Sequence, residues 1–203
     1  MASAADAMLR PAHDAAYRFP PHLAGFTANL LTHAGDAGTV TIGGPRDVSV
    51  VLPDGAADAD WVRGELSSMV AHRWSSDYAD GDGRWAKVTV GSTVRFTDDP
   101  FDSAYKVVDG HIAEVHRTAG DARFAIVVHE RQQAHDDRLI PVRFTVFHWA
   151  VTDGRLLRAD HYRDEYALVD GVHLPAAREV TSAADGRALV TRRVALSDHK
   201  AVW

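Results

Sequence analysis

Repeated Asp-Gly pairs divide the second half of this 203-residue chain into runs with the composition of β-strands. An Asp-Gly pair between two apolar runs favours a two-residue hairpin turn, because both central residues of that turn take a positive φ. The pairs are Asp109-Gly110, Asp153-Gly154, Asp170-Gly171 and Asp185-Gly186. With the other turns, they predict strands over residues 86–90, 93–96, 103–108, 111–117, 123–130, 139–151, 155–169, 172–182 and 187–196. We therefore expect an antiparallel meander.

The first half of the chain adds three short strands and a helix. Runs rich in β-branched residues at 26–32, 38–42 and 47–52 are separated by Gly, Asp and Pro clusters, which is typical of strands joined by turns. Between residues 58 and 73 the apolar residues recur at helical spacing, so this segment is the main predicted helix. A shorter helix is expected around residues 11–18.

These elements predict a mainly β protein of the α+β class. An open, twisted sheet of about ten strands is near the practical limit of size. The long antiparallel meander is therefore expected to curl into a half-barrel or a barrel, with the main helix covering or plugging it. The expected organisation is an N-terminal extension over residues 1–20 and a single half-barrel domain over residues 21–203.

Composition excludes several classes of function. The absence of cysteine rules out thiol nucleophiles, zinc ribbons and cysteine-ligated iron–sulfur clusters. A formal net charge of -6, with no cluster of Lys and Arg among aromatic residues, argues against nucleic acid as a partner. No window approaches 18 uninterrupted apolar residues, so no membrane span is expected. The N-terminus lacks the apolar segment of a secretory signal, so the expected location is the cytoplasm.

Several short motifs resemble a domain-of-unknown-function family that is best known from photosynthetic organisms. They are residues 19–28, His72-Arg73 at the end of the main helix, residues 105–112, Asp164-Glu165-Tyr166, residues 169–178 and residues 196–199. The resemblance covers nearly the whole chain. That family has no established activity, so the resemblance implies no catalytic residues.

The closing pattern of the chain is also similar to the half-barrel of the lipoprotein-localisation factors. It consists of a strand, the segment 170–175, a second strand, an Asp-Gly pair and a third strand. Those factors carry acyl chains, so the resemblance implies a concave apolar cavity. This chain departs from them because it lacks an export signal.

The hairpin at residues 139–169 allows side chains to be assigned to faces. If residues 153–154 form a two-residue turn, Val146 lies opposite His161. His148 and His161 then share one face as diagonal neighbours, with Cβ atoms roughly 7 Å apart, a span that two imidazoles can bridge around one ion. The sequence therefore predicts a metal site at this pair.

The shared face is expected to point inward, because it also carries apolar side chains of the first strand. Arg163 and Glu165 follow His161 on the second strand and are expected to pair with each other or with the histidines. Asp164 lies on the other face and is expected to pair with an arginine. The predicted ligand-binding residues are Phe144, Val146, Arg163, Trp74 and Trp85, the two tryptophans forming a lid from either side of the loop between them.

A metal centre needs at least a third ligand, for which His129, His116 and His72 are the candidates. Histidine or histidine–carboxylate ligation suits copper, zinc, iron or nickel, and copper-dependent oxidation is the first version to test. Glu165 and Tyr162 are the predicted catalytic residues, assisting proton transfer. A strand histidine is more often satisfied by a carbonyl or a carboxylate, so a structural role for these histidines is the alternative.

Two functions from different classes remain open. In the first, the chain is an oxidoreductase-type enzyme that holds an apolar small molecule near a histidine-ligated metal. In the second, the same cavity binds a lipid or another apolar ligand and releases it unchanged, and the histidines orient the ligand through hydrogen bonds.

Overall fold

The computed structural model describes residues 3–74, 78 and 82–203, which form two compact units. The first unit contains Met1–Tyr17, Ser76–Tyr162 and Thr181–Val190, and the second contains Arg18–Ser75, Arg163–Val180 and Thr191–Trp203. The division falls within three strands. Each unit is therefore assembled from segments that are distant in the sequence.

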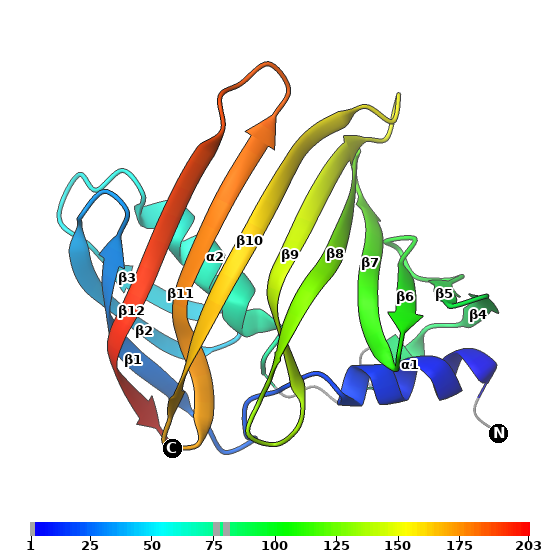
Figure 1. Cartoon of the computed structure of the whole chain (residues 1–203), viewed down its shortest axis with the longest axis horizontal. Coiled ribbons are helices and arrows are strands. Elements are labelled where there is room, and N and C mark those ends of the chain that lie inside the picture. Colours follow the sequence, from blue (N-terminus) through cyan, green and yellow to red (C-terminus); the bar gives the residue numbers. More distant parts are fainter. Residues whose placement is uncertain (1–2, 75–77, 79–81) are drawn as a thin grey trace. The chain divides into compact units, whose positions relative to one another are not determined.

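One twelve-stranded sheet contains all the described strands, in the order β3-β2-β1-β12-β11-β10-β9-β8-β7-β6-β5-β4 (Figure 1). The strands are β1 (Gly25–Thr32), β2 (Ala37–Gly44), β3 (Asp47–Val51), β4 (Lys87–Val90), β5 (Thr93–Phe96), β6 (Ala104–Val108), β7 (His111–Ala119), β8 (Ala122–Gln133), β9 (Leu139–Ala150), β10 (Leu156–Val169), β11 (Val172–Ala184) and β12 (Val190–Val202). Neighbours in the sheet are neighbours in sequence, except where β1 pairs with β12. Two meanders are thus joined by one long-range antiparallel pair.

Each predicted strand is present, and the prediction of a mainly β, antiparallel fold with a main helix is confirmed. Strand β12 differs most from its predicted range of 187–196. It starts later and continues to Val202, because β1 provides a pairing partner as far as Gly25. Within the described residues, β3 and β4 are the two edges of the sheet, so the closed-barrel form of the prediction is not adopted.

Two of the Asp-Gly pairs form the expected two-residue turns. Asp109 and Gly110 have φ values of 50° and 75°, and Asp170 and Gly171 have φ values of 48° and 80°. Two successive positive φ angles are what a type I′ turn requires. In the first of these hairpins, Val108 accordingly pairs with His111.

The connection between β9 and β10 is longer than predicted. Of residues 153 and 154, only Gly154 has a positive φ, of 70°. The N–H of Ala150 donates to the carbonyl of Arg155 at 3.0 Å, and the N–H of Gly154 donates to the carbonyl of Ala150 at 3.1 Å. The turn is therefore closed by Ala150 and Arg155, which changes the register of this hairpin.

The first helix, α1 (Ala4–Asp14), begins earlier than the predicted range of 11–18. Ser3 is its N-cap, and the Ser3 side chain accepts a hydrogen bond from the N–H of Asp6 at 3.1 Å. This cap satisfies a backbone donor at the helix start. Because the helix begins at Ala4, Pro11 lies inside it. Three helix residues are buried in one core with four strand residues. The helix residues are Ala5, Leu9 and Ala12, and the strand residues are Val94, Phe96, Tyr105 and Val107. Helix α1 is thus part of the packed core of the first unit.

The second helix, α2 (Ala59–Ala71), is the predicted main helix and lies in the second unit. Its apolar residues at helical spacing are buried, and they are Val62, Leu66, Met69 and Val70. A 3-10 helix, η1 (Asp82–Arg84), precedes β4. Neither α-helix of the described residues combines the length and the apolar composition that crossing a bilayer demands.

A buried ion cluster connects α2 to β10 and β11 in the second unit. Arg178 is 2% exposed, and its Nε and Nη2 donate to the two carboxylate oxygens of Asp164 at 2.8 and 2.7 Å. Its Nη1 donates to the carboxylate of Glu65 at 3.1 Å and to the Glu65 carbonyl at 3.2 Å. Burial acts to lower the pKa of Arg178, but Asp164 and Glu65 raise it above its ordinary value. The expected pairing of Asp164 with an arginine is confirmed.

Replacing Arg178 with Met is expected to lower the free energy of unfolding by about 3–5 kcal/mol, because it leaves the carboxylate of Asp164 buried without its partner. The double variant Arg178→Met, Asp164→Leu removes both charges and is expected to recover most of this loss. Urea denaturation of the wild type, both single variants and the double variant measures the coupling. Single-variant losses that simply add would contradict the pairing.

Candidate functional site

Strands β7 to β10 of the first unit share an apolar surface, which we name the helix-side face. It points to the same side as Tyr105, a core residue packed with α1, because Tyr105 lies opposite Val115 in the pairing of β6 with β7. Cross-strand pairs and one ring contact extend this face across the strands. Its apolar residues are Val115, Ile126, Val128, Phe144, Val146 and Tyr162.

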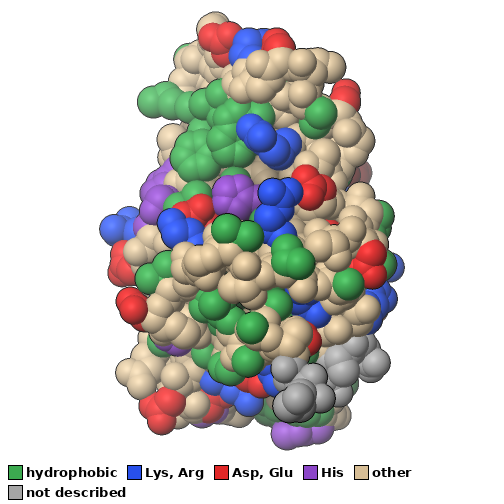
Figure 2. All heavy atoms as spheres, turned by 90° about the vertical axis from the view of Figure 1, so that its right-hand side faces the viewer, with side chains coloured by type: hydrophobic (Ala, Val, Ile, Leu, Met, Phe, Trp, Pro, Cys, Tyr) green, Lys and Arg blue, Asp and Glu red, His purple; other side chains and the backbone are tan. Residues whose placement is uncertain are grey.

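The six side chains of the helix-side face are half-buried. The core packed with α1 is closed by comparison, since Val94 is 0% exposed and Tyr105 is 5% exposed. Helix α1 contacts β4 to β7 (Figure 1). The apolar residues of the face continue onto the next strands of the sheet, β8, β9 and β10. On the side of the molecule drawn in Figure 2, hydrophobic side chains gather in the upper part, next to basic and histidine side chains. A half-accessible apolar surface of this kind favours contact with an apolar ligand.

A row of polar and aromatic residues borders the apolar ones on the same face. Phe124 lies opposite Arg117 on β7 and opposite His148 on β9. The Nε2 atom of His148 lies 3.4 Å from Oδ2 of Asp160, and Arg158 Nη2 lies 3.4 Å from the same nitrogen. Four neighbouring strands therefore supply this polar row.

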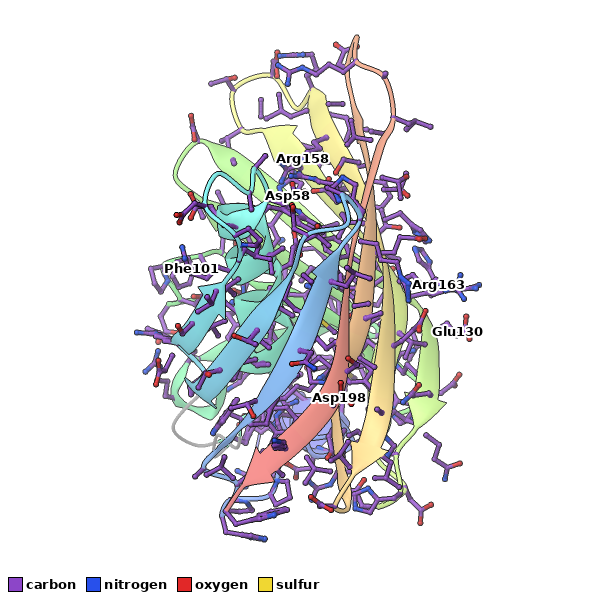
Figure 3. The ribbon with its side chains drawn as sticks, turned by 90° about the vertical axis from the view of Figure 1, so that its left-hand side faces the viewer. Asp58, Phe101, Glu130, Arg158, Arg163 and Asp198 are labelled. Atoms are coloured by element: carbon purple, nitrogen blue, oxygen red, sulfur yellow. The ribbon has the colours of Figure 1, made fainter. Side chains whose placement is uncertain are left out.

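Asp160 is the buried centre of the row, with a side chain that is 4% exposed. Nε of Arg158 donates to its Oδ2 at 2.8 Å. Its other oxygen, Oδ1, is enclosed and has no hydrogen-bond partner among the described residues. Arg158 and Glu130 lie on opposite sides of the sheet (Figure 3). One buried acceptor beside the apolar surface is thus left unused, which costs free energy until a donor reaches it.

His148 lies between the carboxylate of Asp160 and the apolar side chains. Burial lowers the pKa of His148 below its ordinary value of 6.5, the charge of Arg158 lowers it further, and Asp160 acts in the opposite direction. The imidazole is therefore neutral at pH 7. A neutral imidazole held in this way can form a hydrogen bond with a polar group of a ligand on the same face.

The lowered pKa of His148 predicts a pH-dependent stability. The unfolded chain binds a proton at His148 near pH 6.5, whereas the folded protein resists it, so stability falls as the pH drops through 6.5 and levels off below the folded pKa. Urea denaturation of wild type and His148→Gln at about pH 7.5 and pH 5.5 measures this difference. We expect the wild type to lose more stability than the variant, and equal losses would contradict the prediction.

The predicted register of the β9–β10 hairpin is wrong by one residue. Oγ1 of Thr145 lies 3.2 Å from Nδ1 of His161, whereas the predicted register placed Val146 opposite His161. Side chains alternate along a strand, so a shift of one residue moves the whole set to the other face. His148 and His161 therefore lie on opposite faces of the sheet, and the predicted pair is not brought together.

Two residues that were predicted to follow His161 into a cavity are also on its exposed face. Arg163 is exposed and projects away from the ribbon (Figure 3). Glu165 is exposed as well and lies 3.4 Å from Nη2 of Arg193. Tyr162 instead lies on the helix-side face, where its ring stacks on that of Phe144 at a centroid distance of 4.7 Å. The alternate set of β10 residues thus reaches the site.

The remaining predicted metal ligands are dispersed. His129 shares a face with His161, since its Nε2 lies 2.8 Å from Oγ1 of Thr145 and the two imidazole centroids are 6.1 Å apart. Nε2 of His116 lies 3.0 Å from a carboxylate oxygen of its neighbour Glu114. His72 is the C-cap of α2 in the second unit. Over the described residues, no three His, Cys, Asp or Glu side chains are grouped as metal ligands, and metal binding stays a prediction.

The two tryptophans predicted as a lid lie in different units. Trp74 packs edge-to-face on Phe19 in the second unit, with ring centroids 5.0 Å apart. Trp85 packs against the core of the first unit, and the guanidinium of Arg84 lies 4.7 Å from its ring. Residues 75–77 and 79–81 of the intervening loop lie outside the described residues, and the lid stays a prediction.

Among the residues of the site that sequence reasoning missed are Ile126 and Val128 on β8 and Arg158 and Asp160 on β10. For the two β10 residues, alternation along the strand was sufficient information once the turn had its correct length. For the two β8 residues, the register with β9 was hidden by the connection 134–138. That connection is a compact turn in which the N–H of Ala134 donates to the carbonyl of Arg138 at 2.7 Å.

Comparison with known proteins places the chain in a family. A family model described as a protein of unknown function (DUF3386) matches residues 1–202, so the chain belongs to this family. A search of curated proteins finds no match. Among solved structures, the chain is similar to a LolA superfamily protein from Nitrosomonas europaea, with 14% identity and a TM-score of 0.41. The match covers 98% of this chain and 94% of that protein.

Proposed function

We propose that this member of the DUF3386 family binds an apolar small molecule or lipid on the helix-side face and releases it unchanged. One observation carries the proposal. Six apolar side chains on four adjacent strands form a continuous surface that starts at Val115, beside the core packed with α1, and extends onto β8, β9 and β10, and all six remain half-accessible. Each Å² of that surface removed from water by a ligand contributes roughly 25 cal/mol.

The polar row supports the same function, because its hydrogen-bonding groups can orient a ligand while the apolar part of the face carries no charge. The ion pair of Arg158 with Asp160 neutralises both charges, and His148 is neutral at pH 7. A ligand with one polar group is therefore oriented by hydrogen bonds at the row while its apolar part lies on the face. Few polar groups in a mostly apolar site is the usual composition of a small-molecule site.

Two variants test the proposed function. One places a charge on the helix-side face, and the other places the same charge on the opposite face of the sheet. Val128 lies opposite Phe144 on the helix-side face, whereas its neighbour Val127 lies opposite Thr145 on the other face. Both valines are half-buried. We expect Val128→Glu to weaken binding of the neutral apolar dye Nile red by about tenfold or more, because the carboxylate loses hydration against the bound dye. Fluorescence titration measures the dissociation constant.

Val127→Glu is the matched control, since it has the same substitution one residue away. It is expected to keep the wild-type affinity for the dye. Circular dichroism establishes that both variants fold. A wild-type protein that does not bind Nile red, or equal losses of affinity in the two variants, would overturn the proposed function.

Metal analysis of protein purified without a histidine tag separates binding from the metal-dependent oxidation considered above. Metal-free protein that co-purifies with an apolar compound, identified by mass spectrometry of an organic extract, supports the binding function. Near-stoichiometric copper, zinc or iron that is lost on replacing His129 or His161 supports the enzyme. The cytoplasmic location expected from the N-terminal sequence stays a prediction, which fractionation of cells tests.

A further inference from the structure

A second buried arginine in the second unit has far fewer partners than Arg178. Arg73 follows α2 directly, and its backbone is anchored at both ends: its N–H donates to the carbonyl of Val70 at 2.9 Å, and its carbonyl accepts from the N–H of Phe19 at 2.6 Å. The residue is 7% exposed. The fold therefore holds this guanidinium in a fixed, largely desolvated position.

The guanidinium of Arg73 makes one hydrogen bond with the described residues. Its Nη2 donates to the hydroxyl of Tyr166 at 3.2 Å, and its carbon lies 5.5 Å from the centre of the Tyr166 ring. Its Nε is enclosed and has no acceptor. No carboxylate of a described residue lies within ion-pair distance of Arg73. The positive charge is thus buried against a neutral phenol.

Neighbouring charges do not compensate for Arg73, because they are already paired with one another. Among the described residues, Asp164 acts on Tyr166 through its charge, and both Asp164 and Glu65 bind Arg178. The same edge of the two guanidinium groups is used very differently. In Arg178, Nε and Nη2 both donate to a carboxylate, whereas in Arg73, Nη2 meets a hydroxyl and Nε meets no acceptor.

Tyr166 adds a further unused donor at the same place. Its hydroxyl oxygen accepts from Arg73, and none of the described residues accepts the hydroxyl proton. Burial raises the pKa of Tyr166, so the phenol keeps that proton at neutral pH. Two donors, the Nε–H of Arg73 and the O–H of Tyr166, therefore lie at one buried edge without an acceptor.

From this excess of donors and of positive charge, we infer that Arg73 and Tyr166 form a binding site for an oxyanion, a carboxylate or a phosphate. A guanidinium edge binds these groups through charge-assisted hydrogen bonds, and it does so most strongly where water is excluded. A bound anion neutralises the charge of Arg73, which has no carboxylate partner among the described residues. Arg73 and Tyr166 belong to the second unit, whereas the residues of the helix-side face belong to the first.

Thermal unfolding with added anions tests the site in the full-length protein. Sodium phosphate, sodium acetate and sodium octanoate are titrated against sodium chloride at constant ionic strength. A ligand that binds only the folded state raises the unfolding temperature in a saturable way. We expect such a rise in the wild type, with a dissociation constant about tenfold weaker in Tyr166→Phe and about a hundredfold weaker in Arg73→Met.

The three anions distinguish the source of the group. A response to phosphate alone indicates a free or headgroup phosphate, and a response to octanoate exceeding that to acetate indicates the carboxylate of an amphiphile. Arg193→Met is the control for loss of one positive charge, because Arg193 is partly exposed and pairs with Glu165 at 3.4 Å. This control is expected to keep the wild-type response.

Stability without anion separates a binding role from a structural one. Arg73→Met removes an unpaired buried charge, so its unfolding temperature in chloride is expected to equal or exceed that of the wild type. No saturable response of the wild type to any of the three anions overturns the proposal, as does an unchanged response in both Arg73→Met and Tyr166→Phe. If Arg73→Met does not fold, the role of Arg73 is structural and the proposal fails, whatever Tyr166→Phe shows.

Discussion

The ion cluster of Arg178, Asp164 and Glu65 is the interaction on which the second unit depends. It links a helix to two strands, and removing either Arg178 or Asp164 alone leaves its partner charge buried, since both residues are almost fully buried. Apolar packing tolerates small displacements, but a two-bond guanidinium–carboxylate pair does so far less. The cluster therefore sets where α2 lies on its strands, and with it the position at which the chain leaves α2 at His72 and Arg73.

Three arginines illustrate how one residue type serves different purposes in this chain. Arg178 has a complete set of acceptors and fastens secondary structure together. Arg158 is half-exposed and shares the carboxylate of Asp160 with a neutral histidine, which leaves one oxygen of that carboxylate unused. The guanidinium of Arg73 has a hydroxyl as its one hydrogen-bond partner among the described residues. Burial separates Arg158 from the other two, and the acceptors around each guanidinium separate Arg178 from Arg73.

Most of the strand pattern could be predicted from the sequence, because turn chemistry is local. Asp109-Gly110 and Asp170-Gly171 adopt two positive φ angles and give the expected hairpins. Asp153-Gly154 has the same two residues but lies in a longer turn. Which of the two turns forms depends on the strands that the turn connects. That difference moved His161 off the predicted site while leaving His148 in place. The partners of Asp160 and Arg73 depend on tertiary packing, which no local pattern encodes.

Strand β10 has acids and tyrosines in strict alternation with exposed residues, in the order Asp160, Tyr162, Asp164, Tyr166. Each member has a dedicated partner on its own side of the sheet, among them Arg158 for Asp160, Phe144 for Tyr162 and Arg178 for Asp164. A single-residue deletion in the turn before β10 is therefore not a local change. It either shortens the turn or shifts the whole strand by one residue. In the shifted strand, His161, Arg163 and Glu165 take the buried positions, whose neighbours do not match them as hydrogen-bond or ion-pair partners. Pairing errors in this hairpin thus carry a large energetic penalty, because one slip removes the partners of several buried side chains at once.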